Sequence, residues 1–243
     1  RHDLWVHVDA ALAGSALVLP EMRYMIEGVE GVDSFVFNPH KWLFTNFDCS
    51  AYFVRDSEAL RKTFEIHPEY LKTREGRLVH NYRDWSIQLG RRFRSLKLWF
   101  VLRSFGAEGL RSRIREHLRL AWELAGEIDA TRDFERLAPT PLNTVCFHYI
   151  PEAGGPGAAG GTARVHAGTP GSEDTLDNEA RERVNELNRR LLETINDSGE
   201  AYLTHTVLDG AFTCRFVIGQ TNVEERHVRE TWKMIQQIAR TLA

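Results

Sequence analysis

SFVFNPHKWL, residues 34–43, is the most informative stretch of the sequence. In it an apolar run ends at Asn38 and Pro39, and a lysine, Lys41, follows at once. The apolar half is typical of a buried strand, and the proline fixes the backbone of the turn that follows. A lysine just past a strand end can form an imine with a carbonyl compound when its surroundings free the amine of its proton. The stretch therefore indicates chemistry at the end of a strand.

A second apolar run lies upstream at residues 4–9, and it ends in Asp9, Ala10 and Ala11. Its composition is typical of a strand buried on both faces. A small-residue turn and a helix predicted at residues 20–30 connect this run to residues 34–38, which makes a βαβ unit with parallel strands. Open α/β sheets bind ligands at the carboxyl ends of their strands, so we expect Asp9 and Lys41 to lie at the same edge.

The remaining elements predict a mostly parallel sheet followed by a smaller α+β unit. A strand at residues 50–55 is expected to be antiparallel, since only about eight residues precede it, and a helix at 57–64 is expected to be capped by Ser57. A helix at 92–105, with its apolar side chains packed on one side, and a helix at 110–128 are separated by Gly106 and Gly109. Strands are then predicted at residues 134–138, 144–150, 202–207 and 212–218, and helices at 177–196 and 223–241.

The composition is that of an ordinary globular protein, with 42% hydrophobic and 27% charged residues among 243 and a net charge of −3. Neither nucleic-acid binding nor a membrane span is indicated by these values. Three cysteines at no metal-ligand spacing favour a reducing compartment, so a cytoplasmic protein without a metal site is expected. Cys146 and Cys214 lie in apolar runs and are predicted to be buried thiols.

Two segments and the start of the chain complete the pattern. Residues 65–85 are polar and without periodicity, and a loop of this length is often functional or disordered. Residues 153–171 are rich in Gly, Ala and Pro and lack the G-x-G-x-x-G pattern, so a surface insertion is predicted rather than a phosphate-binding loop. The chain begins at Arg1 and reaches a strand almost at once, and we expect it to be the C-terminal portion of a longer protein.

Asp9 and Lys41 together suit pyridoxal 5'-phosphate. A lysine can hold the aldehyde of this cofactor, and a carboxylate can keep its pyridine nitrogen protonated, which makes the ring an electron sink. The alternative is a surface lysine and a strand-end aspartate with no common role. That alternative is preferred for either residue alone, whereas the pair on neighbouring strand ends favours the cofactor.

Several runs in this order resemble the group II pyridoxal-phosphate-dependent decarboxylases, and most closely the aromatic L-amino-acid decarboxylases. They are VHVDAALAGSALVLPEMR, DSFVFNPHKW, TNFDCSAYFV, LGRRFRSLKLWFVLRSFG and FTCRFVIGQTNVEERHV. The resemblance implies an α/β, aspartate-aminotransferase-like (fold type I) enzyme, with residues 1–100 in the large domain and 101–243 in the small one. It also implies a homodimer with sites shared between subunits, and a lyase of amino-acid and other carboxylic-acid metabolism that releases carbon dioxide and an aromatic amine.

The resemblance assigns roles to five residues near the two strand ends. Lys41 matches the Schiff-base lysine, Asp9 the partner of the pyridine nitrogen, and Ala11 the small residue that lets the cofactor ring approach the strand. Asn38 and His40 match residues near the cofactor phosphate. For His40, a role in shaping the turn is an equal alternative.

Tyr70, in the polar loop, matches a mobile catalytic tyrosine. A phenol on a closing loop can deliver a proton to the α-carbon after carbon dioxide leaves, and it can exclude water. Relatives with phenylalanine at this position are oxidative aldehyde synthases, so Tyr70 favours plain decarboxylation. Without the resemblance, Tyr70 would be interpreted as an ordinary exposed tyrosine.

Other interpretations stay open at this point. Gly90 matches a position where plant relatives vary between glycine and serine, which hints at indole or broad aromatic substrates. Arg215 could form a salt bridge within its domain or approach the substrate. The alternative functions are oxidative aldehyde synthesis, transamination, decarboxylation of an acidic amino acid such as glutamate, and an inactive truncated fragment. The resemblance places the ring-stacking residue and most of the phosphate loop outside this chain, which alone is expected to bind the cofactor poorly.

Overall fold

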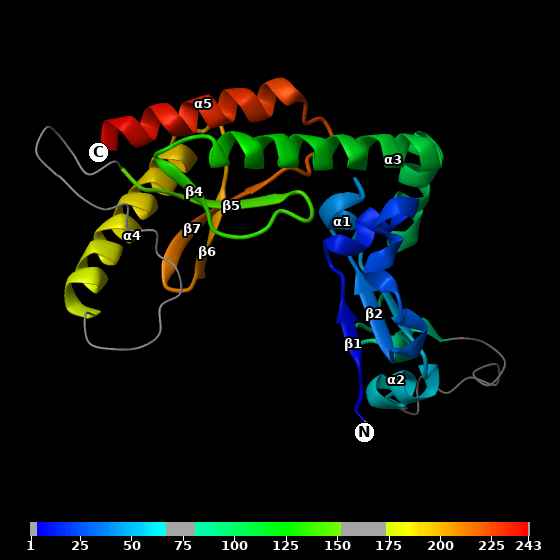
Figure 1. Ribbon diagram of the computed structural model, residues 1–243. Coiled ribbons are helices and arrows are strands. Elements are labelled where there is room, and N and C mark those ends of the chain that lie inside the picture. Colours follow the sequence, from blue (N-terminus) through cyan, green and yellow to red (C-terminus); the bar gives the residue numbers. More distant parts are fainter. Residues whose placement is uncertain (1–3, 67–80, 152–173, 243) are drawn as a thin grey trace, which may run out of the picture. The chain divides into compact units, whose positions relative to one another are not determined.

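The computed structural model describes residues 4–66, 81–151 and 174–242. The chain forms two compact units, Arg1–Ile114 and Arg115–Ala243, whose elements are labelled in Figure 1. The boundary between the units falls within one long helix. The division into domains at residue 100 stays a prediction.

The first unit carries a three-stranded sheet in the order β1-β2-β3. β1 (His7–Asp9) runs parallel to β2 (Ser34–Phe37), and β3 (Ala51–Val54) runs antiparallel to β2. Asp9 lies opposite Val36 in the parallel pair. The predicted parallel pair and the antiparallel third strand are therefore confirmed.

The connection from β1 to β2 differs from the single helix predicted at residues 20–30. It consists of three 3₁₀ helices, η1 (Ala13–Val18), η2 (Pro20–Ile26) and η3 (Val29–Gly31). Gly28 separates the last two with a left-handed φ of 85°. Because a residue in this conformation ends a right-handed helix, one continuous helix cannot form across residues 20–30.

The prediction that residues 4–9 form a strand buried on both faces is wrong in two respects. Only residues 7–9 belong to β1, and Leu4, Trp5 and Val6 have relative exposures of 70, 56 and 47%. The physical reason is that residues 4–6 lie before β1 and little of the described chain packs on their side chains.

Two helices follow the sheet. α2 (Ser57–Phe64) is capped by Asp56 and not by Ser57, because the Asp56 carboxylate accepts from the backbone N–H groups of Glu58 and Ala59, each at 3.0 Å. The predicted cap, Ser57, was therefore wrong by one position.

Within the loop predicted at residues 65–85, the described part ends in a short 3₁₀ helix, η6 (Tyr82–Trp85).

The long helix α3 (Arg94–Asp129) covers both predicted helices except residues 92 and 93. Its helical geometry is interrupted at Gly106, which has φ 64° and ψ 176°. The apolar side chains near its start were expected to pack on one side, and this is wrong in the described chain. Four of these side chains are exposed instead of packed: Phe93, Leu96, Trp99 and Phe100.

The second unit is an antiparallel sheet covered on one face by helices. The strand order is β4-β5-β7-β6. The elements are β4 (Phe134–Arg136), β5 (Thr144–Tyr149), β6 (Thr204–Leu208), β7 (Ala211–Val217), α4 (Asp174–Asp197) and α5 (Glu225–Leu242). Alternate residues of β5 pack in one core with α4, α5 and the C-terminal part of α3. Within this core Trp232 meets Phe134 and Phe147 edge-on, with ring centroids 4.8 and 5.8 Å apart.

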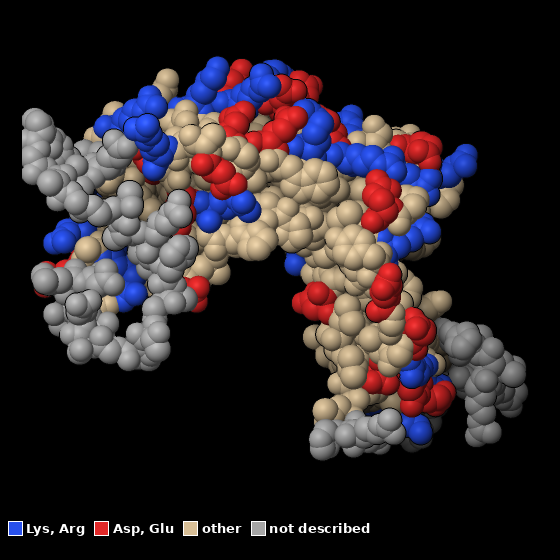
Figure 2. All heavy atoms as spheres, in the orientation of Figure 1, with Lys and Arg blue, Asp and Glu red and all other residues tan. Residues whose placement is uncertain are grey.

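Charged side chains of both signs are mixed on the face shown in Figure 2. In the second unit Arg119 pairs with Glu116 and Glu123 of its own helix and with Glu225 of α5. No helix of the described residues is long and apolar enough to cross a bilayer. The same part of the chain holds no cluster of three His, Cys, Asp or Glu side chains suited to a metal ion.

All three cysteines are free. Cys214 is buried as predicted, and burial raises the pKa of its thiol to about 12. Cys146 is only half-buried, which corrects its predicted full burial, because it lies on the face of the sheet opposite the helix-covered core. Burial raises the pKa of the Cys146 thiol, and the nearby Arg215 partly offsets that rise.

Candidate functional site

Lys41 lies on α1 (Pro39–Trp42), a short helix that begins directly after β2. Pro39 occupies its first turn, where a proline loses no helical hydrogen bond, and the N–H of Lys41 donates to the carbonyl of Asn38 at 2.9 Å. Trp42 is fully buried, whereas Lys41 is exposed. The buried tryptophan anchors the helix and leaves the lysine free to react.

Asp9 ends β1 at the same edge of the sheet. Its Oδ1 accepts a hydrogen bond from the N–H of Ala11 at 2.9 Å, which holds the carboxylate at the strand end. The backbone pairing continues past the strands, since Ala10 N–H donates to Val36 at 2.9 Å and Asn38 N–H donates to Ala11 at 3.0 Å. The structure therefore brings four of the predicted site residues to one edge: Asp9, Ala11, Asn38 and Lys41.

The side chain of Asn38 carries an unusual polar atom. Its Oδ1 is buried and has no hydrogen-bond partner within the described residues. A buried polar atom left without a partner costs about 1–3 kcal/mol. Rotation of the amide by a half-turn would place its NH₂ group there, suited to an anionic oxygen. The edge thus has a polar group that a bound molecule would satisfy.

His40 is tied to the backbone of Cys49, in the loop between α1 and β3. Its Nδ1 lies 3.0 Å from the N–H of Cys49 and 2.7 Å from the Cys49 carbonyl, and its ring meets Phe47 edge-on at 4.8 Å. One nitrogen cannot accept and donate at once, so the tautomer selects one of these bonds. Either bond supports the role of shaping the turn, and the role near a phosphate stays a prediction.

The same loop is tied to the start of α3. Asp48 forms an ion pair with Arg94 at 2.9 Å, and this guanidinium holds the pKa of the Asp48 carboxyl below its usual value. The Cys49 thiol donates to the carbonyl of Arg94 at 3.9 Å. Sequence reasoning missed this support for the lysine turn, because the partners are about 45 residues apart and no motif links them.

A further polar group precedes Asp9 on β1, and sequence reasoning missed it as well. Trp5 Nε1 donates to Ser34 Oγ at 3.0 Å, and His7 Nδ1 lies 2.7 Å from the same hydroxyl. The alternation of residues 5, 7 and 9 along the strand was the available signal, since alternate residues line one face.

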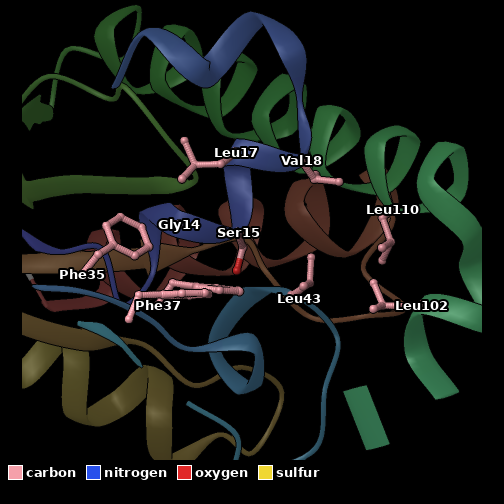
Figure 3. Close-up of a pocket in the computed structure, with 10 residues that line it drawn as sticks. Gly14, Ser15, Leu17, Val18, Phe35, Phe37, Leu43, Leu102 and Leu110 are labelled. Carbon is pink, nitrogen blue, oxygen red and sulfur yellow. The ribbon is translucent and has the colours of Figure 1, made fainter. Parts of the chain in front are cut away.

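The opposite face of this sheet lines an apolar cavity of about 310 Å³. Figure 3 shows Phe35 and Phe37 on one side of it and Leu17 and Val18 on another. Gly14 is required there, because a Cβ on it would lie 2.3 Å from the Cβ of Phe37. None of the residues lining the cavity is titratable, so the strand edge and not this cavity is the candidate site.

Three other predicted residues lie away from the edge or outside the described residues. Tyr70 falls outside the described residues. Gly90 is exposed, and a Cβ added to it would meet nothing within 4 Å. Arg215, on β7, lies opposite Cys146 of β5.

Comparison with known proteins shows the family of the chain. Residues 1–150 match the pyridoxal-dependent decarboxylase conserved domain. The chain is 42% identical over 244 residues to tyrosine decarboxylase 1 of Narcissus pseudonarcissus, covering 100% of this chain and 44% of that protein.

Solved structures share the fold. Oryza sativa TDC, solved with PLP and tryptamine, is 38% identical with a TM-score of 0.82 over 99% of this chain and 45% of that one. Rhodiola rosea 4-hydroxyphenylacetaldehyde synthase is 34% identical with a TM-score of 0.77 over 98% of this chain and 44% of that one. The predicted fold type I class is confirmed by these likenesses.

The chain spans about 44% of the length of the curated relatives it matches. Within that span the family model covers the sheet, the lysine turn and α3. This chain belongs to the pyridoxal-dependent decarboxylase family.

Proposed function

We propose that the full-length protein decarboxylates an aromatic L-amino acid with pyridoxal phosphate and releases the amine and carbon dioxide. The observation that carries this proposal is the meeting of Asp9, Ala11, Asn38 and Lys41 at one sheet edge. Relatives named tyrosine decarboxylase and tyrosine/DOPA decarboxylase favour an aromatic substrate over an acidic one.

The residues at the edge fit the cofactor. Lys41 would hold the aldehyde through its amine, Asp9 would hold the protonated pyridine nitrogen, and Ala11 would leave room for the ring. Asn38, whose buried Oδ1 lacks a partner in the described part of the chain, would turn its NH₂ group toward the phosphate. When bound, the cofactor supplies an electron sink for the pair of electrons that departing carbon dioxide leaves behind.

The protein residues then have separate tasks. The carboxylate of Asp9 is held in place by the N–H of Ala11, so it can keep a proton on a ring nitrogen without moving. The amine of Lys41 would hold the cofactor before the substrate binds and would take it back when the product leaves. Tyr70, outside the described residues, would give a proton to the α-carbon.

Replacement of the lysine tests the assignment. Lys41→Ala should remove the visible absorbance of the bound cofactor and lower carbon dioxide release by at least about 10²–10⁴-fold, the range for a group that acts directly in the reaction. Spectra and carbon dioxide assays of the full-length protein measure both. Lys62→Ala, an exposed lysine of α2, is the matched control and should change neither. A Lys41→Ala protein that kept its absorbance and turnover would overturn the assignment.

The aldehyde-synthase alternative is tested at Tyr70, and the Rhodiola rosea relative makes the test pertinent. Tyr70→Phe should shift the products from amine to aldehyde, ammonia and hydrogen peroxide, with consumption of dioxygen, because the α-carbon loses its proton donor. Product analysis by chromatography and a peroxide assay measure the change. An unchanged yield of amine would reject the role of Tyr70.

The substrate, assembly and location are proposed as well. A panel of tyrosine, DOPA, tryptophan, phenylalanine and glutamate, with carbon dioxide as the readout, identifies the substrate. We propose a cytoplasmic homodimer, supported by the family resemblance and by three free thiols. Light scattering on the full-length protein and microscopy of a tagged form test these two statements. The large and small domains at residues 1–100 and 101–243 are proposed on the same resemblance.

A further inference from the structure

Three residues of β1 and its approach share one side of the sheet with the proposed cofactor site. Successive side chains of a strand point to opposite faces, so Trp5, His7 and Asp9 line one face. His7 lies opposite Ser34 and Asp9 opposite Val36. The ring of His7 also lies 6.1 Å from the ring of Tyr52, which is paired with Val36 from the other side. His7 is therefore on the same face as Asp9, about 6.6 Å along the strand.

The contacts of Ser34 fix the tautomer of His7. Ser34 is buried, and its Oγ accepts the indole N–H of Trp5 at 3.0 Å, which is a donor only. The hydroxyl has one proton, and in the described part of the chain His7 Nδ1, at 2.7 Å, is the acceptor available to it. Since a buried hydroxyl without an acceptor is costly, Ser34 donates to Nδ1 and the proton of the neutral imidazole sits on Nε2.

We infer that His7, held by Ser34 as the Nε2-protonated tautomer, is a positioning residue that presents a neutral hydrogen-bond donor beside Asp9. This inference rests on the proposed function. Asp9 uses Oδ1 for the N–H of Ala11, and its other oxygen is left for the ring nitrogen and for a neighbouring donor. A cationic imidazole would compete with the protonated pyridine nitrogen for the same carboxylate, whereas a neutral donor supports the carboxylate without such competition.

The experiment uses the full-length protein, freed of its cofactor and titrated with pyridoxal 5'-phosphate. Loss of the Nε2 donor beside Asp9 is expected to weaken cofactor binding roughly threefold to tenfold in Ser34→Ala and in His7→Asn, with a changed absorbance spectrum of the bound cofactor. His7→Gln places an amide N–H near the position of Nε2, and Ser34→Thr keeps the hydroxyl. Both are expected to bind within about twofold of the parent, with its spectrum.

A matched control and a folding measurement complete the design. His205→Asn changes an exposed histidine of β6 and should leave binding and spectrum unchanged. Melting temperatures identify any variant that fails to fold, and the pair His7→Gln and His7→Asn keeps the comparison within one position. Equal binding and identical spectra for these two variants would overturn the inference. A parent protein that takes up no pyridoxal phosphate would instead overturn the proposed function, so the two failures are distinguishable.

Discussion

The pKa of His148, a side chain of the second unit, is set mainly by its burial. It lies on β5 opposite Glu135 of β4, with Nε2 at 3.2 Å from a carboxylate oxygen. Its Nδ1 is buried without a partner in the part of the chain that the structure describes. Burial lowers the pKa of His148 below its ordinary value of 6.5, because the charged imidazole loses its water, and Glu135 acts in the opposite direction with a smaller effect.

This lowered pKa makes stability depend on pH. Below about pH 6.5 the unfolded chain binds a proton at His148 that the folded chain does not, so the free energy of unfolding should fall until the pH reaches the lowered folded pKa. The slope is at most about 1.4 kcal/mol per pH unit for one proton. His148→Gln should reduce this slope between pH 7 and 5 in denaturant unfolding experiments. Parallel curves for His148→Gln and the parent would contradict the prediction.

At the scale of residues, the sequence predicted where the strand ends lie better than it predicted side-chain contacts. Asp9 and Lys41 could be placed at one edge because each follows a strand closely and parallel strands end together. The cap of α2 could not be decided by residue type, since Asp56 and Ser57 are both good caps and only backbone geometry separates them. The contacts of His40 and Ser34 depend on tertiary distances that no local pattern carries.

At the scale of elements, the close packing of η1 on β2 shapes the edge that carries the site. Gly14 lets η1 approach, since a Cβ at this position would lie 2.3 Å from the Cβ of Phe37. That Phe37 atom is attached to the backbone of β2 and cannot move unless the strand moves. Phe37 directly precedes Asn38, so a shift there reaches the turn that holds Lys41.

Gly14→Ala is therefore expected to destabilise the protein by about 1–3 kcal/mol, the usual cost of overpacking. Thermal unfolding of the full-length protein measures this loss. Gly31→Ala is the control, because a Cβ there meets nothing within 4 Å, and its melting temperature should stay within about 1 °C of the parent, as a small stability change allows. Equal melting temperatures for Gly14→Ala and Gly31→Ala would show that β2 tolerates the added methyl group.

The types of the elements could be predicted where local sequence signals were strong. The burial of their side chains could not be predicted. The strand and the turn after it follow from an apolar run and a proline, and the break in α3 follows from Gly106, whereas the short helix α1 was not predicted. The 3₁₀ connection was missed because Gly28 was not recognised as a left-handed residue. The exposure of Trp5 and Phe93 could not be predicted, since apolar patterns indicate which face is buried and not what covers it.

At the scale of the whole molecule, two observations belong together: the first unit exposes many apolar side chains, and the relatives are much longer than the part that this chain matches. Its exposed apolar side chains include Leu4, Trp5, Val6, Tyr52, Phe53, Phe93, Leu96 and Phe100. The curated relatives are more than twice as long as the part matched by this chain, which spans 44% of them. Large exposed apolar areas mark surfaces that other protein segments cover. The fold type could be predicted from ordered motifs, and the covering segments could not be predicted from this stretch.

The 243-residue chain by itself should consequently bind pyridoxal 5'-phosphate far more weakly than the full-length protein. In the proposed function, Asp9, Ala11, Asn38 and Lys41 would supply one side of a cradle. A cofactor held on one side keeps much of its surface in water, whereas small-molecule sites bury about 70–90% of the ligand. The expected loss is at least about a hundredfold in affinity, which equals about 2.7 kcal/mol. Absorbance titrations of both forms measure it, with Lys41→Ala as the baseline for each. A stoichiometric cofactor spectrum from the 243-residue chain would show that the four edge residues suffice.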